Sequence, residues 1–236
     1  MDWRRLAGIG WIIAVIAAAP ARAAEDGFER WLVEFKAKAA EEGIRPQLLD
    51  EAFEGIAPDD EVIALDQKQP ENKVTVTRYL ENTVPERRVK KARRMMEEYH
   101  DVLAAISHRY GVQPKYIVAL WAIESDFGRN KGNFSVVQSL ATLAYEGRRA
   151  EFFSKELIAA LHIMQKENMR ADALVGSWAG AMGDCQFMPS TYLQFAVDGN
   201  GDGHRDIWNA PPDVFASIAH YLHALGWNNK VGWGRA

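Results

Sequence analysis

One stretch of the 236-residue chain decides the choice of fold, PKYIVALWAIESDFG at residues 114–128. Proline is favoured at the first position of a helix and glycine just past its end, so the stretch predicts a helix that begins at Pro114 and ends before Gly128. Glu124 is the only acid between residues 116 and 124. It follows Leu120 and Trp121 by four and three residues, which places all three on one helix face.

A carboxyl group on such an apolar face suits an acid catalyst. Apolar neighbours penalise the charged form and raise the pKa of the carboxyl group, which is what a general acid needs near neutral pH. The pattern fits equally well a glutamate that reaches water or pairs with a cation such as Arg129. Asp126 stands two residues further on, so a helix directs it away from Glu124 and we expect no partnership between the two acids.

The rest of the chain indicates a mainly α fold, because few segments alternate apolar and polar residues as a half-buried strand does. We expect helices at residues 28–42, 46–53, 85–110, 152–167 and 211–225, and loops at 66–74, 176–189 and 197–206. Gly111 and Pro114 give a stop and a new start between two helices. These elements suggest a helical region over residues 24–105 that leads into a helical core over 106–236.

Composition and charge narrow the class of protein. Hydrophobic residues make up 48% of the chain, which is enough for a substantial core. The formal net charge is −4, and it falls to −6 without residues 1–23, so we expect no nucleic-acid partner. Cys185 is the only cysteine, which rules out an internal disulfide. We expect a monomer that is stabilised by packing.

The N-terminus has the pattern of an export signal. Arg4 and Arg5 precede an apolar run from Leu6 to Ala19, and Pro20 and an Ala-Arg-Ala segment at 21–23 follow. The run is short for a membrane span, and small residues stand where a signal peptidase reads. We therefore expect a signal peptide over residues 1–23 and a periplasmic protein. The alternative is an uncleaved anchor; no cysteine follows the run, which argues against a lipoprotein.

Several ordered blocks together carry a family resemblance. The segment WAIESDFGR at residues 121–129 resembles the catalytic-glutamate segment of the lytic murein transglycosylase B family. The resemblance continues, in order and spacing over roughly residues 28–236, through QSLATLAY at 138–145, RRAEFF at 148–153, GSWAGAMGDCQFMPS at 176–190, DGNGDGHRDIW at 198–208 and YLHALGW at 221–227.

The resemblance implies a lysozyme-like helical core with an N-terminal helical extension. It also implies cleavage of the MurNAc–GlcNAc β-1,4 bond of peptidoglycan with formation of 1,6-anhydro-MurNAc. Glu124 would make both proton transfers, with no second carboxylate of the kind that most glycosidases use. Glycan strands would be the substrate, and the cell-wall synthesis or division machinery a source of protein partners. A hydrolytic muramidase and a non-catalytic murein-binding or scaffolding module remain the alternatives.

The glycine-rich block at 176–189 is the expected wall of a glycan groove. Glycines permit positive φ and close backbone approach, so such a loop can lie against a polysaccharide, or else pack on the core as a purely structural loop. The resemblance implies that the groove is lined by Ser177, Gln186, Phe187 and Tyr221. Cys185 stands where the family usually has another residue, and we expect an unpaired thiol without a catalytic role.

Arg148 and Arg149 match a paired arginine of the family. Two adjacent cations in an acidic protein suit the lactyl or peptide carboxylates of murein. The alternative is surface pairing with Glu146 or Glu151.

The segment DGNGDGH at residues 198–204 has the spacing of the first half of an EF-hand loop. Asp198, Asn200 and Asp202 take positions one, three and five, and His204 would offer its main-chain carbonyl at position seven. Position twelve is Asn209, which lacks the usual carboxylate. The resemblance implies that Asp213 completes the site, with Asp206 as the alternative. Hard oxygen ligands favour a structural Ca²⁺ ion, with no organic cofactor expected; an Asp/Gly turn without metal is the other interpretation.

Members of the resembling family continue past the segment that corresponds to Gly232–Arg235. Their further part completes the groove and supplies a tyrosine–asparagine pair. Because loss of one preorganised polar donor typically costs about 10²–10³ in rate, we expect residues 24–236 to bind murein but to turn it over at least about a hundredfold more slowly than a longer relative.

Overall fold

The computed structural model describes residues 18–68 and 75–231, and side chains from residue 27 onward. The expected mainly α fold is confirmed. The described residues form eleven α-helices: α1 (Ala18–Glu41), α2 (Pro46–Ala52), α3 (Asp60–Gln67), α4 (Val76–Thr83), α5 (Glu86–Glu98), α6 (His100–Tyr110), α7 (Pro114–Ser125), α8 (Val136–Glu146), α9 (Ala150–Glu167), α10 (Pro189–Phe195) and α11 (Pro211–Ala224).

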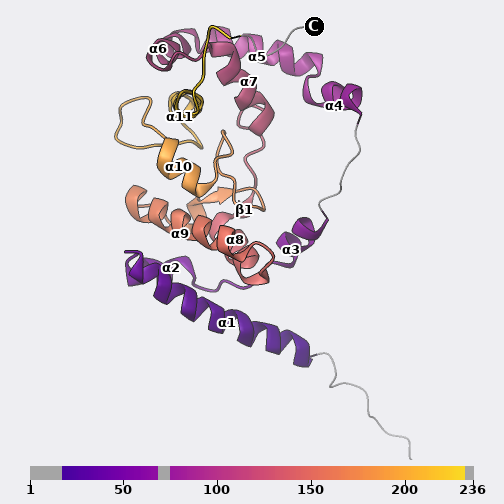
Figure 1. Ribbon diagram of the computed structural model, residues 1–236, viewed down its shortest axis with the longest axis vertical. Helices are drawn as coiled ribbons and strands as arrows, with labels where there is room; N and C mark the ends of the chain where they lie inside the picture. Colours follow the sequence, from indigo (N-terminus) through magenta and orange to yellow (C-terminus); the bar gives the residue numbers. More distant parts are fainter. Residues whose placement is uncertain (1–17, 69–74, 232–236) are drawn as a thin grey trace, which may run out of the picture.

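The helices form an elongated body (Figure 1). Helices α1 and α2 lie at one end beneath α8 and α9, helices α5, α6 and α7 form the other end, and α10 and α11 lie between. One short antiparallel pair joins β1 (Phe134–Ser135) to β2 (Val175–Gly176), with Phe134 opposite Gly176. A single 3₁₀ turn, η1 (Ala171–Ala173), precedes β2.

One hydrophobic cluster runs through the described chain and includes residues from Phe28 to Ala219. Helix α1 joins it through an aromatic contact, because the ring centroid of Phe28 lies 5.3 Å from that of Tyr145 on α8. The N-terminal helices thus share the core of the remainder. The expected boundary between residues 105 and 106 falls inside α6.

Helix ends marked by glycine or proline lie where the sequence predicts them. Gly111 ends α6 with φ 71°, and Pro114 begins α7. The single helix expected over 85–110 is instead two helices that break at Tyr99, where φ is −104° and ψ is 23°. The ring of Tyr99 packs 5.2 Å from that of Phe215 and 6.1 Å from that of Trp121, so core packing sets this break.

Two further expectations touch the ends of the described ranges. The loop expected at 66–74 begins later, because Asp66 and Gln67 belong to α3, and residues 69–74 lie outside the described part. Most of the expected signal peptide, residues 1–17, also lies outside it; α1 begins at Ala18 with Pro20 in its first turn. Among the described helices, none has the length and apolar composition that crossing a membrane requires.

Candidate functional site

Glu124 lies in the last turn of α7. The helix ends because Asp126 and Phe127 adopt left-handed φ values of 51° and 61°, and Gly128 follows with φ 77°. The hydroxyl of Ser125 ties this turn down: it accepts the Gly128 N–H at 3.0 Å and donates to the Trp121 carbonyl at 3.2 Å. The position of Glu124 is therefore set by a helix end held by its own side chains.

Glu124 faces a cavity of about 200 Å³ between α7, α10, α11 and the glycine-rich loop. The cavity is lined by Leu120, Glu124, Cys185, Gln186, Phe187, Met188, Thr191, Ile218 and Tyr221. Glu124 is the only carboxylic acid in this lining. The lining combines one acid, an amide, aromatic rings and apolar side chains, which suits an uncharged polar ligand with apolar faces.

Glu124 is exposed as a whole residue, but nearby protein atoms partly desolvate its carboxyl group. Surrounding protein atoms raise the pKa of Glu124 above its ordinary value, and burial is the cause. Among the described residues none forms a hydrogen bond or ion pair with this carboxylate. The two other charged groups near the helix end pair with each other: Arg129 lies 2.9 Å from the carboxylate of Asp126. The alternative of a Glu124–Arg129 pair is therefore wrong.

Three of the residues expected to line a groove lie with Glu124. Gln186 lines the cavity with φ 47°, and its side-chain amide donates to the carbonyls of Gly183 at 2.8 Å and Lys131 at 3.2 Å. The ring of Phe187 lies 5.5 Å from that of Tyr221 on α11. The loop that carries Gln186 and Phe187 thus meets Tyr221, which lies at least 34 residues further along the chain, at one wall of the cavity.

Ser177 does not reach the cavity. Its hydroxyl accepts the Ala181 N–H at 3.0 Å and so closes the turn of the glycine-rich loop. Two of the loop glycines serve packing: a Cβ at Gly180 would clash with Leu140, and one at Gly183 would clash with the Ile207 carbonyl. The first half of the loop is thus packed on the core, whereas its second half lines the cavity.

Cys185 is a buried free thiol in the cavity lining. Burial raises the pKa of this thiol well above its ordinary value, so it stays protonated. A protonated, buried thiol is a poor nucleophile.

Arg148 and Arg149 are not part of the cavity lining and instead hold a buried carboxylate. Asp66 on α3 is 2% exposed, and Arg149 Nη2 lies 3.0 Å from its Oδ1. Arg148 binds the Oδ2 of the same carboxylate and donates to the Asp66 main-chain carbonyl at 2.7 Å. Glu151, one of the alternative partners, pairs instead with Lys155 at 2.7 Å. The two arginines therefore fasten α3 to the start of α9.

The acidic loop at 198–206 is organised by its own main chain. Asp198 accepts the N–H groups of Gly201 at 2.6 Å and Gly203 at 2.8 Å. Asn200 accepts the Asp202 N–H at 2.9 Å, and Asp202 in turn accepts the His204 N–H at 2.8 Å. Such turns are typical of the first half of a calcium loop.

Asp213 lies beneath this loop and is fully buried. Its two oxygens accept the Gly199 N–H at 3.0 Å and the Asp206 N–H at 2.7 Å, so it joins both ends of the loop. The Asp206 side chain is occupied by the N–H groups of Trp208 and Asn209. The oxygen donors fit Ca²⁺ in kind, but within the described ranges no group of three acidic, histidine or cysteine side chains converges.

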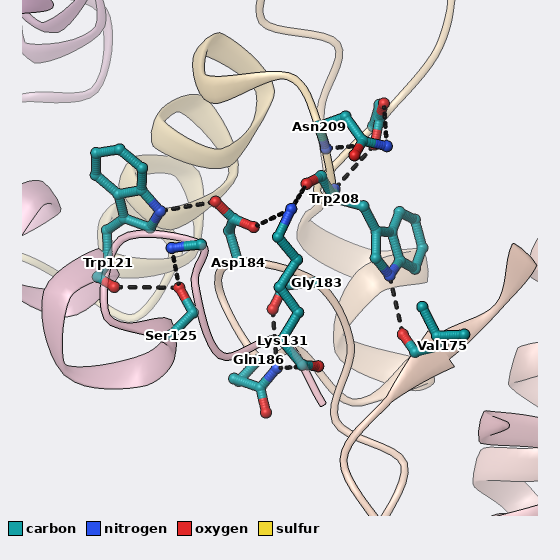
Figure 2. Close-up of polar contacts among 11 residues, drawn as sticks. Trp121, Ser125, Lys131, Val175, Gly183, Asp184, Gln186, Trp208 and Asn209 are labelled. Carbon is teal, nitrogen blue, oxygen red and sulfur yellow. Dashed lines mark hydrogen bonds and ion pairs between the residues drawn. The ribbon is translucent and has the colours of Figure 1, made fainter. Parts of the chain in front are cut away.

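A buried carboxylate near the cavity, that of Asp184, was missed by sequence reasoning (Figure 2). Asp184 is 5% exposed; it accepts the Trp121 indole N–H at 2.8 Å and lies 3.1 Å from the ammonium of Lys131. Lys131 also donates to the Trp208 carbonyl. Trp121 and Asp184 are 63 residues apart, so no local pattern connects them. The one available signal is a lone acid inside an otherwise uncharged block.

The site thus combines a helical body with one carboxyl group at a helix end that has no partner among the described residues and that faces a cavity of about 200 Å³. The chain belongs to the transglycosylase SLT domain family, whose sequence profile matches residues 27–236. The resemblance to the lytic murein transglycosylase B family and the expected lysozyme-like fold are thereby confirmed.

Individual relatives support this family assignment. The chain is 44% identical over 131 residues to the membrane-bound lytic murein transglycosylase B of Escherichia coli (strain K12). This alignment covers 55% of this chain and 36% of that protein. It is similar to SltB3 of Pseudomonas aeruginosa, crystallised in complex with NAG-NAM-pentapeptide, at 45% identity and a TM-score of 0.84 over 87% of this chain and 55% of that one.

A further similar structure is the Escherichia coli lytic transglycosylase Slt35 in complex with calcium. The identity is 36% and the TM-score 0.77, over 84% of this chain and 63% of that one. The chain thus spans between about a third and two thirds of the length of these relatives.

Proposed function

We propose that this chain cleaves the MurNAc–GlcNAc β-1,4 bond of peptidoglycan and forms 1,6-anhydro-MurNAc, with Glu124 as the single acid and base. The observation that carries the proposal is the state of Glu124: it is the only acid lining its cavity, burial raises the pKa of its carboxyl group, and no described residue pairs with it. A carboxyl group of this kind is protonated at higher pH than an ordinary glutamate and can donate its proton.

The reaction needs two proton transfers and no water. Protonated Glu124 donates its proton to the glycosidic oxygen as the C1–O bond breaks, and the GlcNAc alcohol leaves. The Glu124 carboxylate then takes the proton from the C6 hydroxyl of MurNAc while that oxygen bonds to C1. A single carboxylate suffices because the nucleophile comes from the sugar, unlike in a retaining glycosidase with two carboxylates. SltB3 has also been crystallised with NAG-anhNAM-pentapeptide, which supports this product.

Three side chains of the cavity are suited to hold the glycan. The Gln186 amide nitrogen donates to two carbonyls, and no described residue donates to its oxygen, so this oxygen can accept from a hydroxyl or acetamide N–H. Phe187 and Tyr221 supply aromatic surface for the apolar faces of the sugar rings. We assign Ser177, Arg148 and Arg149 structural roles because their polar groups are used within the protein.

The test is analysis of the products released from purified sacculi by mass spectrometry. We expect muropeptides lighter by one water than the hydrolytic products. Glu124→Gln should keep the fold and still bind sacculi but release no product, whereas Glu151→Gln, an exposed acid on α9, should match the wild type. Products that contain the added water would identify a muramidase. Binding without products by the wild type would identify a murein-binding module.

We also propose that the loop at 198–206 binds a structural Ca²⁺ ion, with Asp213 as the supporting carboxylate. Oxygen donors at EF-hand spacing and the calcium complex of Slt35 support this assignment. Asp198, Asn200 and Asp202 would provide side-chain oxygens and His204 its carbonyl. The ion would tie the loop to α11; it has no step in the reaction.

A further inference from the structure

Asp184 stands at the centre of the contacts that connect the two walls of the Glu124 cavity. One of its oxygens accepts the indole N–H of Trp121, which lies on α7 one turn before Glu124. The residue after Asp184 is Cys185, which lines the opposite wall. Asp184 therefore joins the helix that carries the acid to the loop that faces it (Figure 2).

Lys131 extends this connection to Gln186. Its ammonium lies 3.1 Å from Asp184 Oδ1, while its main-chain carbonyl accepts the side-chain amide of Gln186 at 3.2 Å. One residue thus holds both the carboxylate and the amide that lines the cavity. The contacts form a closed path from α7 through Asp184, Lys131 and Gln186 back to the cavity that Glu124 faces.

The backbone at the end of α7 is shaped to allow this approach. A Cβ at Gly128 would overlap the carboxylate of Asp184, and Gly128 has φ 77°. Asp126 and Phe127 precede it in the left-handed conformation, which is uncommon for residues with side chains. Backbone of this kind persists only where the surrounding structure holds it, and it is frequent at functional sites.

Net stability is a weak explanation for the network. A buried ion pair is often no more stabilising than apolar residues of the same volume, because two charges lose their hydration. Asp184 shows this cost: burial raises the pKa of its carboxyl group, and the contacts with Trp121 and Lys131 only oppose that shift. What the network provides, and an apolar cluster would not, is directional contacts that set a separation.

We propose that Asp184 is a positioning residue for the reaction, and that it holds α7 and the Gln186 loop at the separation across the cavity that turnover requires. The inference rests on the proposed function. Asp184 acts through Trp121 and Lys131 and does not touch the glycan. Because a displacement of about 1 Å can cost about 10²-fold in rate, a residue that only sets a distance can control kcat.

Asp184→Asn is the informative variant. Its amide oxygen can still accept the Trp121 indole N–H, but an NH₂ group replaces the oxygen that faces the Lys131 ammonium. On solubilised glycan strands we expect kcat to fall at least about tenfold, whereas KM stays within about threefold of the wild type. Lys131→Met should likewise lower kcat and leave KM within about threefold of the wild type. The matched control is Asp50→Asn, because Asp50 forms an ion pair with Lys36 on the surface. This variant should change neither kcat nor KM.

Amide and indole hydrogen exchange gives a second reading that does not need turnover. We expect both variants to speed exchange at the Trp121 indole N–H and in residues 120–128 and 183–188, and to leave α8 and α9 at wild-type rates. If Asp184→Asn does not fold, Lys131→Met decides.

The outcomes separate this inference from the proposed function. A wild type that forms no anhydro product refutes the proposed function and, with it, the role of Asp184 in that reaction. Where the wild type is active, kcat within about threefold in both variants overturns the inference and leaves the function intact. Exchange that rises evenly through all helices also overturns it, because that pattern means general destabilisation. Local exchange together with a kcat-only loss supports it.

Discussion

At the scale of single residues, Glu124 is a carboxylic acid without a partner among the described residues. Arg129 is close in sequence but is bound to Asp126, so no cation lowers the pKa of Glu124. Burial alone shifts that pKa, and it shifts it upward. A carboxyl group in this state lowers the stability of the folded protein near neutral pH, but it suits the proton donor of the proposed reaction. Such a trade-off between stability and activity is common at active sites.

This state predicts the pH dependence of the rate. In the proposed reaction, departure of the GlcNAc alcohol needs protonated Glu124, so turnover should fall as pH rises through the raised pKa of this group. A kcat profile against pH should therefore descend at a pH above the value for an ordinary glutamate, which is about 4.3. A profile that rises through the neutral range would show that the proton donor is another group.

The same shift predicts how stability changes with pH. The pKa of Glu124 is higher in the folded than in the unfolded chain, so folding is favoured below the unfolded pKa and loses that contribution as pH rises through the folded pKa. Glu124→Gln cannot ionise and keeps it. At pH 7 we expect the variant to melt above the wild type, with the two curves converging below about pH 4.3. A lower Tm for the variant at pH 7 would mean that Glu124 makes a stabilising contact.

At the scale of helices and loops, termini proved easier to predict than continuity. Gly111 and Pro114 mark their helix ends by backbone chemistry alone, so the sequence shows them. The break at Tyr99 carries no such mark, because it arises where one ring meets Trp121 and Phe215 from distant helices. Asp66 was assigned to a loop for the same reason: its partners lie on another element, more than 80 residues away.

The link between α3 and α9 predicts a loss of stability. Replacing both arginines, Arg148→Ala and Arg149→Ala, leaves the buried Asp66 carboxylate without its charged donors, and we expect the free energy of unfolding in urea to drop by about 1–3 kcal/mol. In an Asp66→Ala background the same two changes should cost little. An equal cost in both backgrounds would show that the arginines stabilise the protein by other contacts.

This comparison also tests the expectation that these arginines bind murein carboxylates. Asp66→Ala with both arginines present should bind sacculi as the wild type does, and so should the triple variant. Weaker binding of sacculi by the triple variant alone would show that Arg148 and Arg149 contribute to substrate binding.

The loop at 198–206 predicts a response to calcium. An ion that binds only the folded protein raises the unfolding temperature with its concentration. We expect Tm in millimolar Ca²⁺ to exceed Tm in chelator, and Asp202→Ala to abolish the difference. Asp172→Ala, an exposed aspartate outside the loop, should retain it. Equal Tm values for the wild type in both conditions would remove the metal from the proposal.

At the scale of the whole molecule, the order of the motifs predicted which side chains meet. Glu124, Gln186, Phe187 and Tyr221 come from segments far apart in sequence, and they were found because the resemblance places each block. Asp184 and Lys131 were not, because no local pattern connects them with their distant partners; the one signal was that Asp184 is the lone acid of its block. Ser177 lies outside the lining of this cavity, and its hydroxyl closes a turn.

The N-terminal residues predict where the protein works. We propose that residues 1–23 are a signal peptide and that the mature protein begins near Ala24 in the periplasm. N-terminal sequencing of the protein from a periplasmic extract should read from Ala24, and Ala23→Leu, which spoils the small residue before the cleavage point, should retain the longer chain. Recovery of the full-length wild type in washed membranes would identify an uncleaved anchor instead.

The Trp121–Asp184 hydrogen bond has a consequence for the order of folding. It spans 63 residues, and the chain between its ends contains α8 and α9, which pack on each other. Contacts between neighbours in sequence close small loops and form early, whereas contacts of long separation form late. We therefore expect α8 and α9 to assemble first and the cavity to close last. A newly made chain would then hold most of its core before Glu124 faces a closed cavity, and the proposed cleavage of peptidoglycan would start only once folding is complete.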